Sequence, residues 1–230
     1  MVIEYIKINP PLATSDYENL LQQLPEKLRQ KNLKYRKYPD RLRNLFGLLI
    51  SKRQLTRFDN QEFDLNQLER TPFNRPYLPK RALDFNISHA GEYVVGVFTE
   101  KAKVGIDIEL KRQVDFKDFK RTMNQDQWRV IYESDDPFRT FYQFWCMKES
   151  VIKADGRGLS IPLTEIILNQ KTITCPGSSW HIEPFQLDED HLGCVASDQL
   201  IDKVELKPVD WEQLKEEFLS LKEHIKQIPG

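Results

Sequence analysis

The chain has 230 residues and a formal net charge of −1, with 40% hydrophobic and 30% charged residues. These fractions are ordinary for a soluble globular protein. No apolar run is long enough to span a membrane, and the N-terminus lacks the layout of a signal peptide. The three cysteines are odd in number and lack metal-ligand spacing, so we expect reduced thiols and a cytoplasmic protein.

The hydrophobic pattern switches between helical and extended periods along the chain. Alternation predicts a first strand over residues 2–8, and cap signals predict helices beginning near Ser15, Pro25 and Asp40. Three antiparallel strands are expected at 83–88, 93–99 and 104–110. Two helices follow, then several short strands, and a final helix from Asp210 to about residue 228. This order indicates an α+β fold in two similar halves, 1–102 and 103–230.

Residues 27–57 concentrate positive charge. The segment holds five Lys, six Arg and one acid, Asp40, for a local sum of +10, so the remainder carries −11. Apolar residues recur at helical spacing within it, which predicts a buried stripe with the cations turned away. Such charge asymmetry favours an anionic partner for this segment.

The stretch from Val104 to Leu110 alternates apolar residues with Gly105, Asp107 and Glu109. This alternation predicts a strand whose second face carries both acids, roughly 6–7 Å apart. At an effective dielectric of about 20 the two charges repel by roughly 2–3 kcal/mol. A bound cation would reverse that repulsion, and loss of Asp107 is expected to leave stability equal or slightly higher. Gly105 on the same face would leave room for a ligand. A half-buried strand with a hydrated acidic face explains the same pattern.

A strongly apolar helix is predicted from Pro137 to the glycines at 156 and 158. Glu149 and Lys153 lie four residues apart on one face of it. A surface ion pair worth a few tenths of a kcal/mol is the simple explanation. The functional alternative brings Glu149 to Asp107 and Glu109 as a third oxygen ligand for a hard cation such as Mg²⁺. Lys153 would then lie near an anionic substrate.

Three motifs in this part of the chain resemble a known enzyme family. They are Phe-Asn-Ile-Ser-His at 85–89, Val-Gly-Ile-Asp-Ile-Glu at 104–109, and Trp-Cys-Met-Lys-Glu-Ser-Val-Ile-Lys-Ala-Asp-Gly-Arg-Gly-Leu-Ser at 145–160. In this order and spacing they resemble the 4'-phosphopantetheinyl transferases of the Sfp (surfactin-synthetase-activating) type. The resemblance covers about residues 85–160 and extends more weakly back to about residue 25.

The resemblance implies both a fold and a reaction. The fold is a pseudo-twofold pair of α/β lobes with the active site in the cleft between them. The reaction is Mg²⁺-dependent transfer of 4'-phosphopantetheine from coenzyme A to a serine of an apo acyl or peptidyl carrier protein, with release of 3',5'-ADP. Mn²⁺ is an alternative metal, and the carrier would serve fatty-acid, polyketide or nonribosomal peptide synthesis. We expect a monomer that binds neither nucleic acid nor membranes.

The resemblance also assigns roles to individual residues. Asp107, Glu109 and Glu149 would hold the metal, and Glu149 and Lys153 would be catalytic, with Glu149 as general base directly or through a metal-bound water. Arg75 occupies the position at which the family usually has the Lys of a Gly-Lys-Pro motif. Leu28 occupies a second position at which the family has a basic residue. The residues expected to bind coenzyme A are Lys31, Arg43, Arg75, Ser88, His89 and Lys153.

Two other functions fit parts of the sequence. Clustered carboxylates would also suit another metal-dependent phosphoryl-transfer enzyme, such as a phosphodiesterase. The basic segment would suit a nucleic-acid-binding protein, but it contains no glycine-rich or aromatic RNA motif, and the rest of the chain is acidic. In the leading hypothesis, outward cations such as Arg53 and Arg57 would instead steer an acidic carrier protein toward the cleft.

Overall fold

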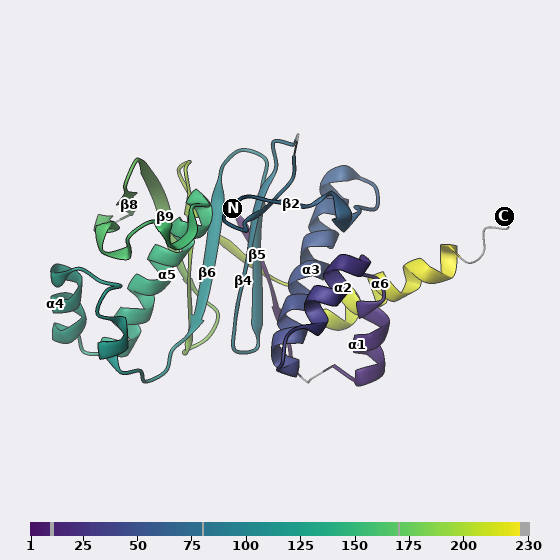
Figure 1. Cartoon of the computed structure of the whole chain (residues 1–230), viewed down its shortest axis with the longest axis horizontal. Helices are drawn as coiled ribbons and strands as arrows, with labels where there is room; N and C mark the ends of the chain where they lie inside the picture. The colour runs from purple at the N-terminus through teal and green to yellow at the C-terminus, as the bar shows by residue number, and fades with distance from the viewer. Residues whose placement is uncertain (10–11, 80, 170, 226–230) are drawn as a thin grey trace.

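The computed structural model describes residues 1–9, 12–79, 81–169 and 171–225, and it shows two main sheets with helices on their outer sides (Figure 1). The first sheet has the order β11-β1-β5-β4 and the second the order β6-β10-β9-β8-β7. The strands of the first sheet are β1 (Val2–Lys7), β4 (Asp84–Ala90), β5 (Tyr93–Thr99) and β11 (Glu205–Pro208). Those of the second are β6 (Val104–Leu110), β7 (Ile167–Asn169), β8 (Thr172–Cys175), β9 (Ser178–Gln186) and β10 (His191–Ser197). A short ribbon pairs β2 (Glu69–Arg70) with β3 (Pro76–Tyr77).

Helices flank both sheets (Figure 1). Beside the first sheet lie α1 (Thr14–Leu21), α2 (Glu26–Leu33), α3 (Tyr38–Asp59) and α6 (Trp211–Ile225). Beside the second lie α4 (Gln125–Glu133) and α5 (Pro137–Asp155). Short 3₁₀ turns occupy Leu65–Gln67, Phe116–Phe119, Gly158–Ser160 and Leu163–Glu165. The helices of the described ranges include none that is long and apolar enough to cross a bilayer.

Three hydrophobic clusters separate these layers. The first, with Phe46 of α3 and Leu214 of α6, lies between the first sheet and its helices. The second joins the facing surfaces of the two sheets and includes Val95 of β5 and Ile106 of β6. The third, with Phe141 of α5, fills the space between the second sheet and its helices. The layers therefore follow the order helix, sheet, sheet, helix, and the predicted α+β class is confirmed.

The sheet membership of two strands differs from the prediction. Strand β6 is not a third strand of the first sheet, because it pairs antiparallel with β10 of the second. Strand β11 pairs in parallel with β1, and α6 packs into the core of the first sheet's helices. The chain from about residue 205 therefore returns to the first half, although the sequence analysis placed all of 103–230 in the second. For the chain before about residue 205, the boundary near residue 102 stays a prediction.

Two helix starts were also predicted wrongly. Helix α1 begins at Thr14 without a side-chain cap, so Ser15 lies inside the helix and forms no capping box. Helix α3 begins at Tyr38, and Asp40 lies in its first turn, where it pairs with Arg43. Helix α4, by contrast, begins with a cap, because the side chains of Asn124 and Gln127 form a reciprocal capping box. The predicted end of the last helix near residue 228 lies outside the described residues.

Side chains from one face of β4 join the two sheets. Residues 84, 86 and 88 share that face because side chains alternate along a strand. Asp84 and Asn86 accept hydrogen bonds from the first and third backbone N–H groups of β6, at 2.8 and 3.1 Å. Ser88 donates to Oδ1 of Asp107 on β6 at 3.0 Å. This row of contacts holds β4 beside β6 and brings the Ser-His motif next to the acidic strand.

Candidate active site

Helix α5 lies directly against β6 at Gly105. A Cβ atom at this position would lie 2.1 Å from the carbonyl oxygen of Ser150 and 2.3 Å from the backbone nitrogen of Ala154, so a larger residue cannot be accommodated without moving the helix. The expectation that Gly105 leaves room for a ligand is wrong, because the backbone of α5 fills that space. The close approach instead brings Glu149 and Lys153 to the acids of β6.

Lys153 and Asp107 form the centre of the site. The Lys153 Nζ lies 2.6 Å from Oδ1 of Asp107, and it donates to the Ser88 Oγ at 2.8 Å. Burial by itself lowers the pKa of Lys153, but the charges of Asp107, Glu149 and Glu109 outweigh burial, and the pKa is raised. Lys153 is therefore a permanent cation surrounded by three carboxyl groups, and it does not form a simple surface pair with Glu149.

The other two acids lie where ionisation is unfavourable. Burial, and then the charge of Asp107, raise the pKa of Glu109 to about 7. The indole nitrogen of Trp145 donates to Oε1 of Glu109 at 3.1 Å and fixes the carboxyl group. Burial, followed by repulsion from Asp107, also raises the pKa of Glu149. One lysine does not offset the negative potential of this group, so a further positive charge would stabilise it.

The chemistry of these acids fits a hard divalent cation. Oδ2 of Asp107 is buried and accepts no hydrogen bond from any described residue, and carboxylate oxygens are the ligands that Mg²⁺ prefers. A bound cation would also offset the electrostatic cost of ionising Glu109 and Glu149. In the described ranges, however, no group of three His, Cys, Asp or Glu side chains has ligating geometry. Lys153 acts here as the counter-charge of Asp107.

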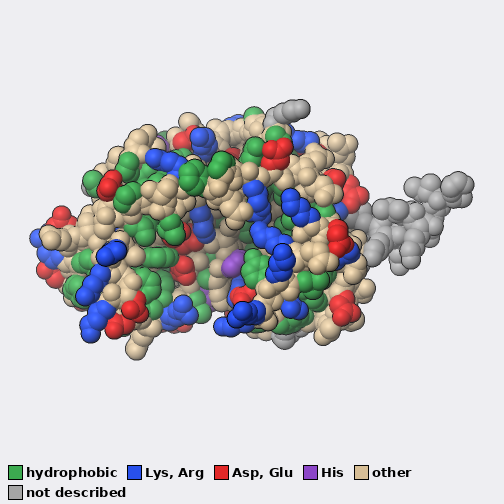
Figure 2. All heavy atoms as spheres, in the orientation of Figure 1, with side chains coloured by type: hydrophobic (Ala, Val, Ile, Leu, Met, Phe, Trp, Pro, Cys, Tyr) green, Lys and Arg blue, Asp and Glu red, His purple; other side chains and the backbone are tan. Residues whose placement is uncertain are grey.

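A groove of about 650 Å³ is lined in part by β4, the strand whose Ser88 bonds to Asp107. Its lining includes apolar side chains, among them Leu48 and Phe85, and a set of cations and one histidine from α2, α3, β2 and β4: Lys27, Arg43, Arg70 and His89. Figure 2 shows a hollow near the middle of one face, with a histidine between acidic side chains on one side and mainly basic ones on the other. The groove therefore combines an apolar wall with a positive rim.

His89 lines the groove and lies close enough to Lys153 for their charges to interact. Desolvation by the walls, followed by the charges of Arg43 and Lys153, lowers the pKa of His89. Arg43 donates through Nη1 to the carbonyl oxygen of Gly91 at 2.7 Å, and its Nη2 pairs with Asp40. A neutral histidine between two cations is a favourable place for an anion, whose charge would favour the protonated ring.

Arg75, for which coenzyme A binding stays a prediction, makes three hydrogen bonds within the protein. Its Nε donates to the Lys153 carbonyl oxygen at 2.8 Å, and its Nη2 donates to Asp84 at 2.7 Å and to the carbonyl oxygen of Val104 at 2.8 Å. These bonds connect the end of α5 to β4 and β6. Asn74 before it has φ +68°, so asparagine adopts the left-handed conformation for which glycine is better suited. Arg75 thus orients the backbone that carries Lys153.

The basic residues of α2 divide between the groove and solvent. Lys31 is exposed and is not among the groove-lining residues; partial burial and then nearby Arg70 lower its pKa. Leu28 contributes an apolar side chain to the groove, whereas Lys27 lines it as a cation. Arg29 pairs with the first residue of α2. Leu28 stands where a basic residue was expected, and Lys27 is therefore better placed than Arg29 to supply that positive charge to the groove.

Sequence reasoning gave no role to three residues that shape the site: Trp145, Arg70 and Lys148. Lys148 is 1% exposed, and its Nζ donates to the carbonyl oxygens of Thr122 and Leu163 and to Gln127. Burial lowers its pKa to about 7. These three bonds anchor α5 immediately before Glu149. A lysine inside an apolar helix was the signal in the sequence that could have identified it.

Comparisons with known proteins place the chain in one enzyme family. The family described as "4'-phosphopantetheinyl transferase superfamily" matches residues 103–196, and "4'-phosphopantetheinyl transferase, N-terminal" matches residues 11–101. The chain is 29% identical to the 4'-phosphopantetheinyl transferase Sfp of Bacillus subtilis over 169 residues, which cover 71% of this chain and 74% of that protein. It is 31% identical over 171 residues, 68% of each chain, to a Haemophilus influenzae protein provisionally named 4'-phosphopantetheinyl transferase.

A mammalian relative extends the comparison. The L-aminoadipate-semialdehyde dehydrogenase-phosphopantetheinyl transferase of Mus musculus is 29% identical over 185 residues, covering 66% of this chain and 60% of that protein. The chain belongs to the 4'-phosphopantetheinyl transferase superfamily. The predicted family and its enzyme class, a transferase of phosphopantetheine, are therefore confirmed.

Proposed function

We propose that this enzyme takes 4'-phosphopantetheine from coenzyme A and transfers it to the serine of an apo acyl or peptidyl carrier protein, releasing 3',5'-ADP. The contact that carries this proposal is the ion pair of Lys153 with Asp107, bridged by Ser88, next to a groove with a positive rim. Coenzyme A has a pyrophosphate and a separate 3'-phosphate, which match the two charged regions. We infer a cytoplasmic monomer as the working form.

Asp107, Glu109 and Glu149 would hold Mg²⁺ or Mn²⁺ in this proposal. The bound ion supplies charge neutralisation at the pyrophosphate. The unpaired Oδ2 of Asp107 and the raised pKa values of Glu109 and Glu149 support this assignment. Lys153, held as a cation by the same acids, would contribute positive charge to the phosphate oxygens.

The 3'-phosphate would bind between Arg43 and His89. A phosphate beside His89 would favour its protonated ring, and the fixed guanidinium of Arg43 offers a charge-assisted hydrogen bond. Lys27 and Arg70 would extend the same positive rim, with Lys31 at its outer edge. The contacts of Ser88 and Arg75 support a role in placing Lys153 against the pyrophosphate.

Glu149 is the proposed general base. It would take the proton of the carrier serine as the serine oxygen bonds to the β-phosphorus. The bond between that phosphorus and the bridging oxygen breaks, and 3',5'-ADP leaves with the oxygen. Positioning and charge neutralisation provide most of the rate enhancement in such transfers.

Release of 3',5'-ADP from coenzyme A, followed with and without an apo carrier protein, tests this function. The proposal expects release only when both the carrier and a divalent cation are present. A metal-dependent phosphodiesterase would release a nucleotide from coenzyme A without any carrier. Carrier-independent release would therefore favour that alternative and contradict the transferase assignment.

A further inference from the structure

His191 extends from the second sheet to the first. It is the first residue of β10, where it pairs with Leu110 of β6, and its side chain packs edge-to-face on Tyr93 of β5 with ring centroids 4.7 Å apart. The residue is 6% exposed. A buried imidazole is expected to have hydrogen-bond partners for both nitrogens, yet only one nitrogen has a partner among the described residues.

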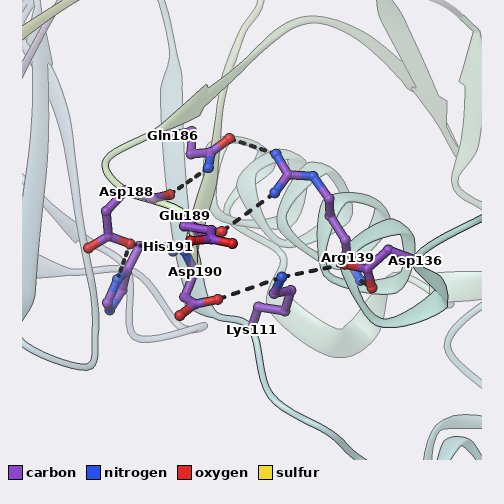
Figure 3. Close-up of polar contacts among 8 residues, drawn as sticks. All are labelled: Lys111, Asp136, Arg139, Gln186, Asp188, Glu189, Asp190 and His191. Carbon is purple, nitrogen blue, oxygen red and sulfur yellow. Dashed lines mark hydrogen bonds and ion pairs between the residues drawn. The ribbon is translucent and has the colours of Figure 1, made fainter.

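Asp188 provides the satisfied contact (Figure 3). Oδ1 of Asp188 lies 2.8 Å from Nδ1 of His191 and also accepts the backbone N–H groups of His191 and Asp190. Burial raises the pKa of Asp188, but these hydrogen bonds outweigh burial and bring the pKa to about 2. Because an ionised carboxylate only accepts hydrogen bonds, Nδ1 is the protonated nitrogen. The geometry therefore assigns the proton and fixes the plane of the ring.

The other nitrogen, Nε2, faces the turn that follows His89. It has no hydrogen-bond partner among the described residues. A Cβ atom at Gly91 would lie 2.5 Å from Nε2, so the imidazole occupies the space where a side chain at that position would begin. Gly91 also has φ +53°, a left-handed conformation that favours glycine. The ring thus supports this turn from the side of the second sheet.

The same turn is also held by Arg43, whose Nη1 donates to the carbonyl oxygen of Gly91 at 2.7 Å. Arg43 and His89 both line the groove. A continuous series of contacts therefore leads from Asp188 through His191 and Gly91 to the Arg43 guanidinium. Displacement of the Gly91 carbonyl would release one of the hydrogen bonds that orient this guanidinium.

We propose that His191, oriented by Asp188, is a positioning residue that holds the Gly91 turn and, through it, fixes Arg43 for the 3'-phosphate of coenzyme A. The inference rests on the proposed function. It makes recognition of one phosphate in the groove depend on a hairpin of the other sheet, although neither Asp188 nor His191 is among the residues that line the groove.

The test compares coenzyme A with dephospho-coenzyme A, which lacks the 3'-phosphate, in His191→Phe and Asp188→Asn. His191→Phe keeps a ring against Tyr93 but loses the bond to Asp188, and Asp188→Asn keeps the histidine and its packing. We expect the Michaelis constant for coenzyme A to rise about three- to ten-fold, from partial loss of one charge-assisted contact. The constant for dephospho-coenzyme A and the turnover number should change little, so the preference for coenzyme A shrinks.

Gln186→Ala is the matched control, because Gln186 belongs to the same hairpin but its side chain is directed toward Arg139 of α5 (Figure 3). Its side chain bonds to Arg139 of α5 at 2.6 Å and to the Asp188 carbonyl oxygen at 2.6 Å. This variant should lose some stability and keep the wild-type preference between the two coenzymes.

Three results have distinct meanings. A wild-type preference in both His191→Phe and Asp188→Asn, even with lower stability, would make His191 a packing residue only and overturn the inference. An equal loss of preference in Gln186→Ala would also overturn it, because the effect would then belong to the hairpin as a whole. Absence of transfer by the wild-type enzyme with any carrier would instead refute the proposed function.

Discussion

Asp107 and Glu109 are two residues apart on β6, yet their removal is expected to change folding stability in opposite directions. Asp107 is the ion-pair partner of Lys153, and its side chain is 5% exposed while that of Lys153 is 29% exposed. Removing one member of a buried pair costs about 3–5 kcal/mol. Because Lys153 is partly hydrated, we expect about 2–3 kcal/mol for Asp107→Asn.

Glu109→Gln should be stabilising above neutral pH. The pKa of Glu109 is raised to about 7, so the folded state binds a proton more tightly than the unfolded state, and ionised Glu109 destabilises the fold above pH 7. The shift corresponds to at most about 3 kcal/mol, and we expect about 1–2 kcal/mol because the residue is partly exposed. The gain in folding stability should be complete at about pH 8 and should vanish below the ordinary pKa of a glutamate. Glutamine keeps an oxygen to accept the Trp145 hydrogen bond.

Urea unfolding of both variants, with a chelator present and at pH 8 and pH 5, measures these differences. A stabilised Asp107→Asn, or a destabilised Glu109→Gln at pH 8, would refute the electrostatic account of the site. The first outcome is what the sequence suggested, since repulsion between the acids predicted that loss of Asp107 would leave stability equal or slightly higher. The contact with Lys153 reverses that expectation.

Three further predictions follow from the same geometry. Glu149→Gln should lose transfer activity far more than coenzyme A binding, measured by calorimetry, whereas Lys153→Ala should weaken both; near-normal turnover of Glu149→Gln would require another base. Arg43→Ala should shrink the preference for coenzyme A over dephospho-coenzyme A, expected to be ten-fold or more in wild type, in competitive binding. Lys148 has a folded-state pKa of about 7, below its ordinary value, so the unfolded state binds more protons above pH 7 and wild-type stability should rise between about pH 7 and 10. Lys148→Met should remove that rise in urea midpoints, and an unchanged slope would mean that this lysine stays charged in the fold.

Local periodicity was enough to predict the functional faces of individual elements. Alternation placed Asp107 and Glu109 on one side of a strand, and helical spacing placed Glu149 and Lys153 one turn apart. The contacts between elements required the structure. The role of Gly105 depends on the backbone of α5 lying against it, and no local pattern specifies which helix approaches a strand. The return of β11 to β1 is likewise a pairing across most of the chain.

The basic segment, residues 27–57, shows that a count of charges along the sequence has the same limit, because it does not show which charges pair in the fold. Its sum of +10 suggested free cations for docking a carrier, with Arg53 and Arg57 among them. The structure pairs both arginines with Glu4, which lies on β1, and pairs Arg53 also with Glu217 of α6. The Arg53 side chain is only 10% exposed. The acids that pair with them come from distant parts of the sequence, but the Arg57 side chain is 46% exposed, so the steering role stays a prediction.

Intact-mass spectrometry of an apo carrier protein, incubated with this enzyme, coenzyme A and Mg²⁺, tests the central claim most directly. The account predicts that the carrier gains the mass of one phosphopantetheine, and that a carrier with alanine in place of its acceptor serine gains nothing. Asp107→Asn should give no gain at the same Mg²⁺ concentration. An unmodified carrier in every wild-type reaction, or full modification by Asp107→Asn, would contradict the account.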